Sequence, residues 1–186
     1  MPKLALLLGV TGSGKSHVSE RLKPSPQILT VDLIRTDAIR FLCTASELEK
    51  HNIYRWPIWD ELLKRPDVHD GICHGIEKRC PGFDPNKATI AEGEMLAHAE
   101  FLQTFLQSLK QMQLLPDPMV TFWLDPEPQI VRRNVIHRGR EGQKNYLMKD
   151  AIDSVKWYRG HTQKLECKRI TEAADAISQI DAFFAS

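Results

Sequence analysis

The sequence predicts an α/β protein: a three-layer sandwich in which helices cover both faces of a mostly parallel, five-stranded sheet. Three observations lead to this fold class. Short apolar runs alternate with segments of helical periodicity, which is typical of βαβ units with right-handed crossovers. The first run, Lys3–Leu8, is apolar from Leu4 onward, as expected of a strand buried on both faces. The chain length of 186 residues suits a single domain spanning 1–186.

The remaining elements follow in chain order. Four further strands are predicted, at Gln27–Val31, Ala88–Ala91, Met119–Leu124 and Glu166–Ile170. The apolar spacing predicts helices at Lys15–Leu22, Leu33–Ala45, Val68–Arg79, Glu94–Leu115, Glu127–His137, a segment ending near Tyr158, and Glu172–Phe184. The clearest apolar face belongs to the predicted helix that ends before Pro116.

The composition limits the classes of partner. With 25 Lys and Arg against 24 Asp and Glu, the formal net charge is +1, so no global basic field recruits nucleic acid or anionic lipid. The longest apolar run, Leu4–Val10, is far shorter than the roughly 20 residues of a membrane span. The four cysteines are scattered without a close pair, which favours reduced thiols. We therefore expect a cytoplasmic protein, a monomer or a homodimer, with no membrane partner.

A glycine-rich segment directly follows the first predicted strand. Residues 9–16 read GVTGSGKS, which matches the phosphate-binding pattern G-x-x-x-x-G-K-[ST] in full. The glycines allow backbone N–H groups to point at phosphate oxygens, Lys15 can neutralise the β- and γ-phosphates, and the Ser16 hydroxyl can ligate Mg²⁺. The sequence thus predicts ATP and Mg²⁺ as cofactors, bound by Gly9, Val10, Thr11, Gly12, Ser13, Gly14, Lys15 and Ser16.

Two copies of a D-x-x-R pattern follow the second predicted strand. Ligands of open α/β sheets bind outside the carboxyl ends of the strands, so Asp32 is a candidate to accept the proton of an attacking hydroxyl. Arg35 is a candidate to hold an anionic acceptor or the transferring phosphoryl group. Asp37 and Arg40, the second copy, are candidate substrate-binding residues. The alternative is structural: Asp32 caps the next helix, and the second copy lies on its solvated face.

These motifs make the sequence similar to the small P-loop kinases. That group includes nucleotide, gluconate and shikimate kinases, the kinase half of polynucleotide kinases, and enzymes like zeta-toxin and chloramphenicol phosphotransferase. The phosphate-binding pattern and the first D-x-x-R carry the resemblance, which extends through Glu92-Gly93 and an arginine-rich segment after the fourth strand. It implies that Glu92 helps to arrange Mg²⁺ or the acceptor.

The resemblance also implies a lid over residues 132–147. Lid arginines in this group close over the phosphates and neutralise charge in the transition state, which makes Arg138 and Arg140 catalytic candidates. Arg133 is a nucleotide-binding candidate, although Arg132 and Arg133 cannot both face the site. A solvated helix face is the alternative for these arginines.

Residues 46–86 are expected to form an acceptor-binding insert. Trp56, Trp59, His69 and His74 could line a pocket for a ring or base there, although tryptophans more commonly join the core. The spacing of His69, Cys73, His74 and Cys80 does not match the usual paired zinc ligands, so a zinc site is disfavoured.

The function that these residues favour is an ATP- and Mg²⁺-dependent kinase acting on a hydroxyl of a small molecule, such as a nucleoside or a sugar. A nucleotide kinase and a polynucleotide 5′-hydroxyl kinase are alternatives, and the near-zero net charge argues against long nucleic acids. An NTP-binding regulatory module is a third hypothesis. The sequence lacks the N-K-x-D motif that a guanine-reading switch would carry.

Overall fold

Five parallel strands form the central sheet of the protein. The computed structural model describes residues 2–23, 25–50, 57–139 and 145–186. The strand order is β2-β3-β1-β4-β5, and every neighbouring pair is parallel. The strands are β1 (Leu4–Leu8), β2 (Gln27–Thr30), β3 (Thr89–Gly93), β4 (Met119–Leu124) and β5 (Lys168–Ile170). The predicted fold class is confirmed, with each strand within a few residues of its predicted range.

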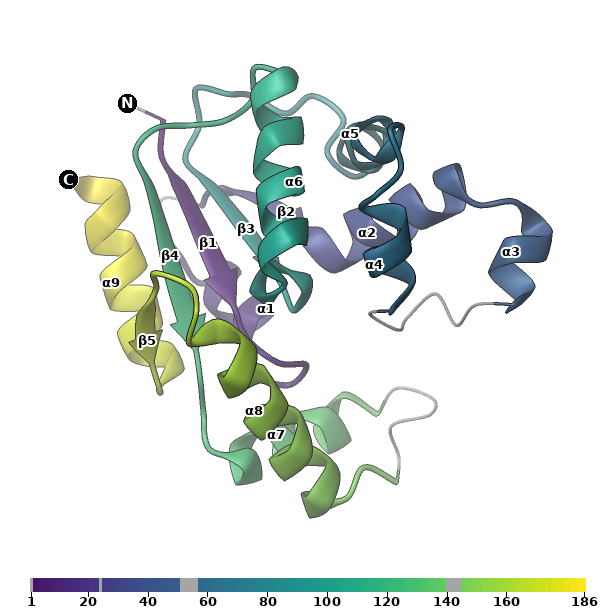
Figure 1. Ribbon diagram of the computed structural model, residues 1–186. Coiled ribbons are helices and arrows are strands. Elements are labelled where there is room, and N and C mark those ends of the chain that lie inside the picture. The colour runs from purple at the N-terminus through teal and green to yellow at the C-terminus, as the bar shows by residue number, and fades with distance from the viewer. Residues whose placement is uncertain (1, 24, 51–56, 140–144) are drawn as a thin grey trace.

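Helices cover both faces of this sheet (Figure 1). They are α1 (Lys15–Ser19), α2 (Val31–Leu42), α3 (Ala45–Lys50), α4 (Pro57–Leu62), α5 (Val68–Arg79), the 3₁₀ turn η1 (Met95–Ala97), α6 (Ala99–Gln111), α7 (Pro128–Arg138), α8 (Met148–Thr162) and α9 (Ala173–Ala185). Of the helices in these described ranges, none combines the length and the apolar character needed to cross a membrane.

The central strand β1 explains the three layers. All five of its side chains are buried, and they alternate between two hydrophobic clusters. Leu4, Leu6 and Leu8 pack with residues of α2, α5, α6 and α8 on one face. Ala5 and Leu7 pack with residues of α1 and α9 on the other. A strand buried on both faces therefore needs no polar alternation, as its sequence indicates.

The predicted helix over Glu94–Leu115 is divided in the structure. Its first residues form η1, and α6 begins only at Ala99. His98 separates the two because its backbone is extended, with φ −83° and ψ 107°, and its Nδ1 accepts a hydrogen bond from the N–H of Phe101 at 3.3 Å. The apolar periodicity continues across this break, so periodicity alone could not reveal it.

Helices α2 and α5 approach each other closely through two glycines. A Cβ at Gly75 would lie 2.5 Å from the carbonyl oxygen of Ile34, and one at Gly71 would lie 2.6 Å from Cγ of Leu42. Helix α5 also has the predicted bounds at both ends. The close packing fixes α2, which carries the first D-x-x-R pattern, against a helix of the 46–86 segment.

Candidate functional site

The phosphate-binding pattern forms the connection between β1 and α1. Gly12 and Gly14 have φ of 86° and 103°, in the left-handed region where only glycine is unstrained. A Cβ on Gly12 would also lie 2.7 Å from Cγ2 of Val135 and 2.8 Å from the carbonyl oxygen of Val131. Glycine is therefore required at position 12 both by the turn and by the close approach of α7.

Two polar groups of this loop fit a phosphate ligand. The Lys15 ammonium donates hydrogen bonds to the carbonyl oxygens of Gly9, at 2.6 Å, and Val10, at 3.1 Å, so it lies against the loop backbone. The Ser13 hydroxyl is buried and has no hydrogen-bond partner among the described residues. A buried hydroxyl without a partner is costly unless a ligand satisfies it. Both observations support an anion bound in this loop.

Glu92 lies beside the predicted magnesium ligand. Its side chain, only 5% exposed at the end of β3, accepts hydrogen bonds from the hydroxyls of Ser16, at 3.1 Å, and Ser19, at 2.9 Å. Within the described ranges no salt bridge neutralises this carboxylate. Carboxylate and hydroxyl oxygens are hard ligands that suit Mg²⁺, so Ser16 and Glu92 fit the implied ion.

Asp32 contacts the segment that follows β3. Its two carboxylate oxygens accept hydrogen bonds from the backbone N–H groups of Glu94, at 3.1 Å, and Met95, at 3.3 Å. The N-cap of α2 is Thr30, so the predicted alternative that Asp32 caps its own helix is wrong. Asp32 instead binds the start of η1. A carboxylate has about four lone-pair positions, so these two bonds leave it acceptor capacity.

Glu94 is a site residue that the sequence reasoning missed. Its Oε2 accepts a hydrogen bond from the Thr11 hydroxyl at 2.9 Å, which places the carboxyl directly over the phosphate loop. Burial raises the pKa of Glu94, and repulsion from Asp32 acts in the same direction against the attraction of Lys15. The available signal was its position directly after a strand, because ligands of open α/β sheets bind outside the carboxyl ends of the strands.

Arg35 is buried next to these carboxylates. The side chain is 8% exposed, and its Nε has no hydrogen-bond partner in the part of the chain that the structure describes. Its positive charge acts to lower the pKa of Glu94, which indicates that the two groups are near each other. A buried guanidinium with an unpaired N–H is suited to an anionic or hydroxyl-bearing ligand.

The second D-x-x-R pattern does not join this cluster. Asp37 was expected on a solvated face or in contact with substrate, but it is 1% exposed and pairs with Lys78, at 2.8 Å, and with Arg79 of α5. Burial acts to raise the pKa of Asp37, but the hydrogen bonds from Arg79 and Lys78 outweigh it and lower the pKa. Asp37 therefore joins α2 to α5, and Arg40 is exposed on α2.

Tyr158, on α8, is a second residue that the sequence did not indicate. Its hydroxyl accepts a hydrogen bond from the backbone N–H of Gly9 at 2.8 Å and donates one to the carbonyl oxygen of Glu94 at 3.3 Å. Burial raises the pKa of Tyr158 well above its usual range, so the hydroxyl stays protonated. Nothing in the local sequence separates this tyrosine from an ordinary core residue.

Two of the predicted lid arginines, Arg133 and Arg138, lie next to a cleft of about 490 Å³. The cleft starts at Ser13 and Gly14 and runs between α7 and the segment Thr171–Ala173 after β5, and Arg133 and Arg138 line it from α7. Helix α7 is held on the loop by the Asn134 side chain, whose Nδ2 donates to the carbonyl oxygen of Gly12 at 2.9 Å. Arg140 lies outside the described residues, as does most of the loop after it.

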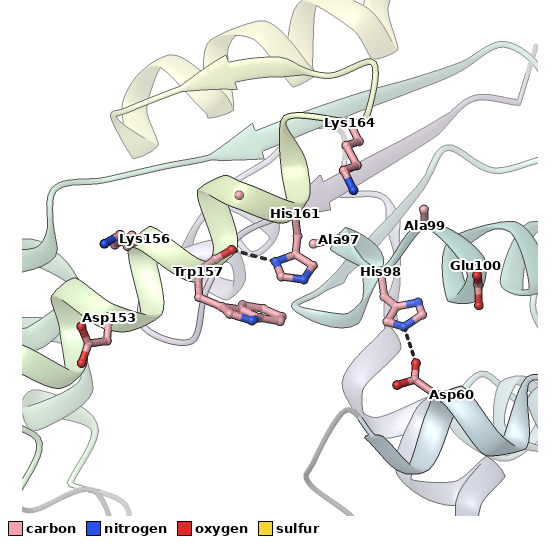
Figure 2. A pocket seen from close by; sticks show the side chains of 11 residues that line it. Asp60, Ala97, His98, Ala99, Glu100, Asp153, Lys156, Trp157, His161 and Lys164 are labelled. Atoms are coloured by element: carbon pink, nitrogen blue, oxygen red, sulfur yellow. Dashed lines mark hydrogen bonds and ion pairs between the residues drawn. The ribbon is translucent and has the colours of Figure 1, made fainter.

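A larger hollow, of about 740 Å³, lies between α8 and the start of α6. Figure 2 shows its two walls: Trp157 and His161 on α8 face His98 and Asp60 across the opening. The floor at Ala97 lies three residues beyond Glu94 in the sequence. Among the described residues, this hollow shares no lining residue with the cleft along α7.

The aromatic residues predicted to line an acceptor pocket have other roles. Trp59 is fully buried and packs edge-to-face on Phe101, with ring centroids 4.9 Å apart, which is the core alternative. His69 forms a 3.0 Å hydrogen bond with the Ser108 hydroxyl, and His74 stacks on a phenylalanine of α2. Trp56 lies outside the described residues. Among those described, no cluster of three or more metal-ligating side chains occurs, and all four cysteines are free thiols.

Comparison with solved structures connects this arrangement to a known fold. A shikimate kinase from Acinetobacter baumannii in complex with shikimate superposes with a TM-score of 0.55 at 12% identity, covering 100% of this chain and 93% of that one. TT1252 from Thermus thermophilus gives 0.56 at 14% identity, covering 99% and 97%. The chain has the fold of the small P-loop kinases.

This kinase-like fold extends over the whole chain. A shikimate kinase from Bacteroides thetaiotaomicron also superposes, with a TM-score of 0.50 at 12% identity, covering 98% of each chain. No protein-family profile and no curated protein sequence matches the chain. The resemblance inferred from the sequence motifs is thus confirmed at the level of the fold.

Proposed function

We propose that the protein is an ATP- and Mg²⁺-dependent kinase that transfers the γ-phosphoryl group of ATP to a hydroxyl of a small molecule. One observation supports this most directly: the phosphate loop, with Lys15 and an unpartnered Ser13 hydroxyl, lies beneath the carboxylates of Asp32 and Glu94 and the buried Arg35. Groups that can bind the phosphates of ATP thus lie next to carboxylates that can accept the proton of a hydroxyl.

The nucleotide would occupy the loop and the cleft along α7. Its phosphates would replace the carbonyl oxygens that Lys15 now contacts, and the Ser13 hydroxyl would gain a partner. The base would extend into the cleft between α7 and Thr171–Ala173, which begins at the loop itself. Arg133 and Arg138 line that cleft and are exposed, so they are free to approach the phosphates from the lid side.

Ser16 and Glu92 would hold Mg²⁺. When it is bound, the ion would neutralise negative charge on the β- and γ-phosphates. Because Glu92 already accepts hydrogen bonds from two hydroxyls, its orientation is fixed before any ligand binds. Such fixed orientation reduces the cost of assembling a metal site.

The acceptor would approach from the side of Asp32 and Glu94. As its oxygen forms a bond to the γ-phosphorus, the bond to the bridging β–γ oxygen breaks, ADP leaves, and the hydroxyl proton passes to a carboxylate. Asp32 is the predicted proton acceptor, and Glu94 is a second candidate because its raised pKa makes it the stronger base. Arg35 would orient the acceptor or the transferring group.

The two carboxylates favour a hydroxyl acceptor over a phosphate acceptor. A nucleotide kinase must bind an anionic acceptor at this position, where Asp32 and Glu94 would repel it and Arg35 supplies one compensating charge. A regulatory NTP-binding module would need no proton acceptor beside the phosphates. The arrangement therefore supports a hydroxyl kinase as the first hypothesis.

The test is a panel of hydroxyl-bearing and phosphate-bearing acceptors incubated with ATP and Mg²⁺, scored for phosphate transfer above the rate to water. We expect transfer to a hydroxyl, and Lys15→Ala should abolish both that transfer and the ATP-dependent rise in Tm. Arg40→Ala, a charge loss on an exposed part of α2, is the matched control. Equal stabilisation of wild type and Lys15→Ala by ATP would show that the loop does not bind the nucleotide.

A further inference from the structure

A buried carboxylate lies directly after β4. The side chain of Asp125 is 4% exposed, and it pairs with two arginines from different elements. Nε of Arg159, on α8, donates to both carboxylate oxygens at 3.0 Å. Arg169, on β5, reaches Oδ2 with Nε at 2.8 Å and with Nη2 at 2.6 Å. These arginines are 34 and 44 positions away from Asp125 in the sequence, so one carboxylate joins three distant segments.

The backbone at Asp125 belongs to the same junction. Its N–H donates to the carbonyl oxygen of Ile170 at 2.8 Å, which continues the pairing of β4 with β5. Two residues further on, Glu127 is the N-cap of α7, and its Oε1 lies 3.8 Å from Nη2 of Arg159. The start of α7 is thus held at this junction too. We call these four residues the Asp125 cluster: Asp125, Glu127, Arg159 and Arg169.

The cluster favours one arrangement of the elements that it joins. A buried carboxylate is stable only while it is paired, and removing one partner leaves a charge uncompensated. The guanidinium of Arg169 is also fixed from a second side, because it lies over the ring of Trp123 on β4, 5.2 Å from the ring centroid. A shift of α8 or β5 relative to β4 would therefore separate charges that are paired in this structure.

The chain on either side of the cluster lines the nucleotide cleft along α7. Pro126 follows Asp125 directly, and Thr171 comes two residues after Arg169; both line the cleft. Asp125 itself is not one of the described residues that line it. The cluster therefore fixes the spacing of the cleft walls from behind.

The α8 side of the cluster leads to the phosphate loop. Tyr158 precedes Arg159, and its hydroxyl bonds to the backbone of Gly9, at 2.8 Å, and of Glu94, at 3.3 Å. Adjacent helix positions differ by about 100° in direction, so the two side chains reach different partners. Because Asp125 holds Arg159, it also fixes the rotation of α8 that places the Tyr158 hydroxyl against the loop.

We propose that Asp125 is a positioning residue for nucleotide binding. Through Arg159 it holds Tyr158 against the phosphate loop, and through Arg169 it holds the wall of the cleft that begins at Thr171. This inference rests on the proposed function, since it takes the loop and the cleft as the site of ATP.

The experiment is a titration of wild type and Asp125→Asn with MgATP, well below the Tm of either protein. Asp125→Asn keeps the size of the side chain but removes the charge that both arginines face, so the Kd for ATP should rise about tenfold or more. Asp37→Asn is the matched control, because Asp37 is also buried and also pairs with two basic side chains, between α2 and α5. It should lower stability and keep the Kd near the wild-type value.

Two further variants test the two branches of the cluster. Arg169→Ala truncates a side chain that is 54% exposed and leaves Asp125 paired with Arg159, so it provides a folded variant even where Asp125→Asn does not fold. It should also raise the Kd for ATP. If Arg159 acts through Tyr158, the effects of Arg159→Ala and Tyr158→Phe on this Kd should not add, and the double variant should bind ATP about as well as the weaker single variant.

Wild-type ATP affinity in Asp125→Asn or in Arg169→Ala would overturn the proposal. Equal weakening by Asp125→Asn and Asp37→Asn would also overturn it, because the effect would then follow from a general loss of stability. Additive effects of Arg159→Ala and Tyr158→Phe would refute the connection through α8. ATP binding that is independent of Lys15 would refute the proposed function, whereas Lys15-dependent binding that is unchanged in Asp125→Asn would refute this inference alone.

Discussion

The hydroxyl of Tyr158 accepts a hydrogen bond from the backbone N–H of Gly9, 2.8 Å away, where the phosphate loop leaves β1. These residues are 149 positions apart in the sequence. The tyrosine hydroxyl also donates to the carbonyl oxygen of Glu94, so one side chain connects α8 with both the first turn of the loop and the end of β3.

Replacing Tyr158 with phenylalanine tests this connection. Tyr158→Phe keeps the buried ring but leaves the Gly9 N–H without a partner, which should lower the free energy of unfolding by about 1–3 kcal/mol. The ATP dissociation constant should rise, because the loop start is then less firmly positioned. Urea denaturation and ATP titration measure the two effects. Tyr146→Phe, which loses only a bond to Ser154, is the control and should leave ATP affinity unchanged.

Substitution of Asp32 and of Asp37 tests which of the two carboxylates takes part in catalysis and which stabilises the fold. Asp32→Asn should lower kcat by roughly a hundredfold or more if its carboxylate accepts the proton, with ATP binding retained. Asp37→Asn should lower the free energy of unfolding by about 1–3 kcal/mol, because the buried links to Lys78 and Arg79 weaken. Its kcat should fall less than about tenfold, or roughly 1.4 kcal/mol in barrier.

Single-turnover phosphate transfer and thermal melts on both variants check this pair. An unchanged kcat in Asp32→Asn would remove Asp32 from the proton transfer and leave Glu94 as the candidate. A large loss of kcat in well-folded Asp37→Asn would mean that the second D-x-x-R pattern reaches the acceptor after all.

Glu94 should make stability depend on pH. Because burial raises its pKa above the ordinary value of 4.5, the folded state binds more protons than the unfolded state between those two values. The contribution of Glu94 to stability therefore falls as pH rises through that window. Glu94→Gln, which stays neutral, should gain stability relative to wild type as pH increases from below 4.5.

Denaturation curves at several pH values measure this difference. Glu20→Gln, at an exposed position on the C-terminal side of α1, is the control and should show no such trend. A constant difference between wild type and Glu94→Gln across the pH range would contradict the raised pKa.

Arg138 should act mainly in turnover. A lid arginine contributes most when charge shifts in the transition state, so Arg138→Ala should lower kcat more than it weakens ATP binding. Steady-state kinetics with the identified acceptor separate the effect on kcat from the effect on the KM for ATP. Arg133→Ala provides the comparison from the same cleft, and we expect its effect to be larger on the KM for ATP. If Arg138→Ala raises only the KM for ATP and leaves kcat unchanged, Arg138 contributes to binding of ATP in the ground state instead.

The elements that the sequence predicted well are those whose signal is local. The five strands follow from runs of apolar residues between turn-forming residues, and the bounds of α5 follow from its apolar spacing at helical intervals. The loop of residues 9–16 is recognisable because its glycine, lysine and serine positions form a short continuous pattern that is typical of phosphate-binding loops.

The parts that the sequence missed depend on contacts between distant segments. Tyr158 reaches Gly9 from α8, and Asp37 is buried because Lys78 and Arg79 lie opposite it on α5. Trp59, in the insert, was predicted as a side chain that could line the acceptor pocket, but its ring is buried in the core. Periodicity indicates that a side chain faces inward, but not whether it meets the core or a cavity.

The glycine contacts between α2 and α5 have a mechanical consequence. With Gly75 against the backbone carbonyl of Ile34, α5 packs closely on α2 and supports the helix that carries Asp32 and Arg35. A side chain larger than hydrogen at Gly75 would displace α2 as a unit, since backbone atoms cannot yield as a flexible side chain can. Displacement of about 1 Å at reacting groups can cost about a hundredfold in rate. Substitutions on α5, remote from the phosphates, can therefore impair chemistry by shifting the geometry of groups that they never touch.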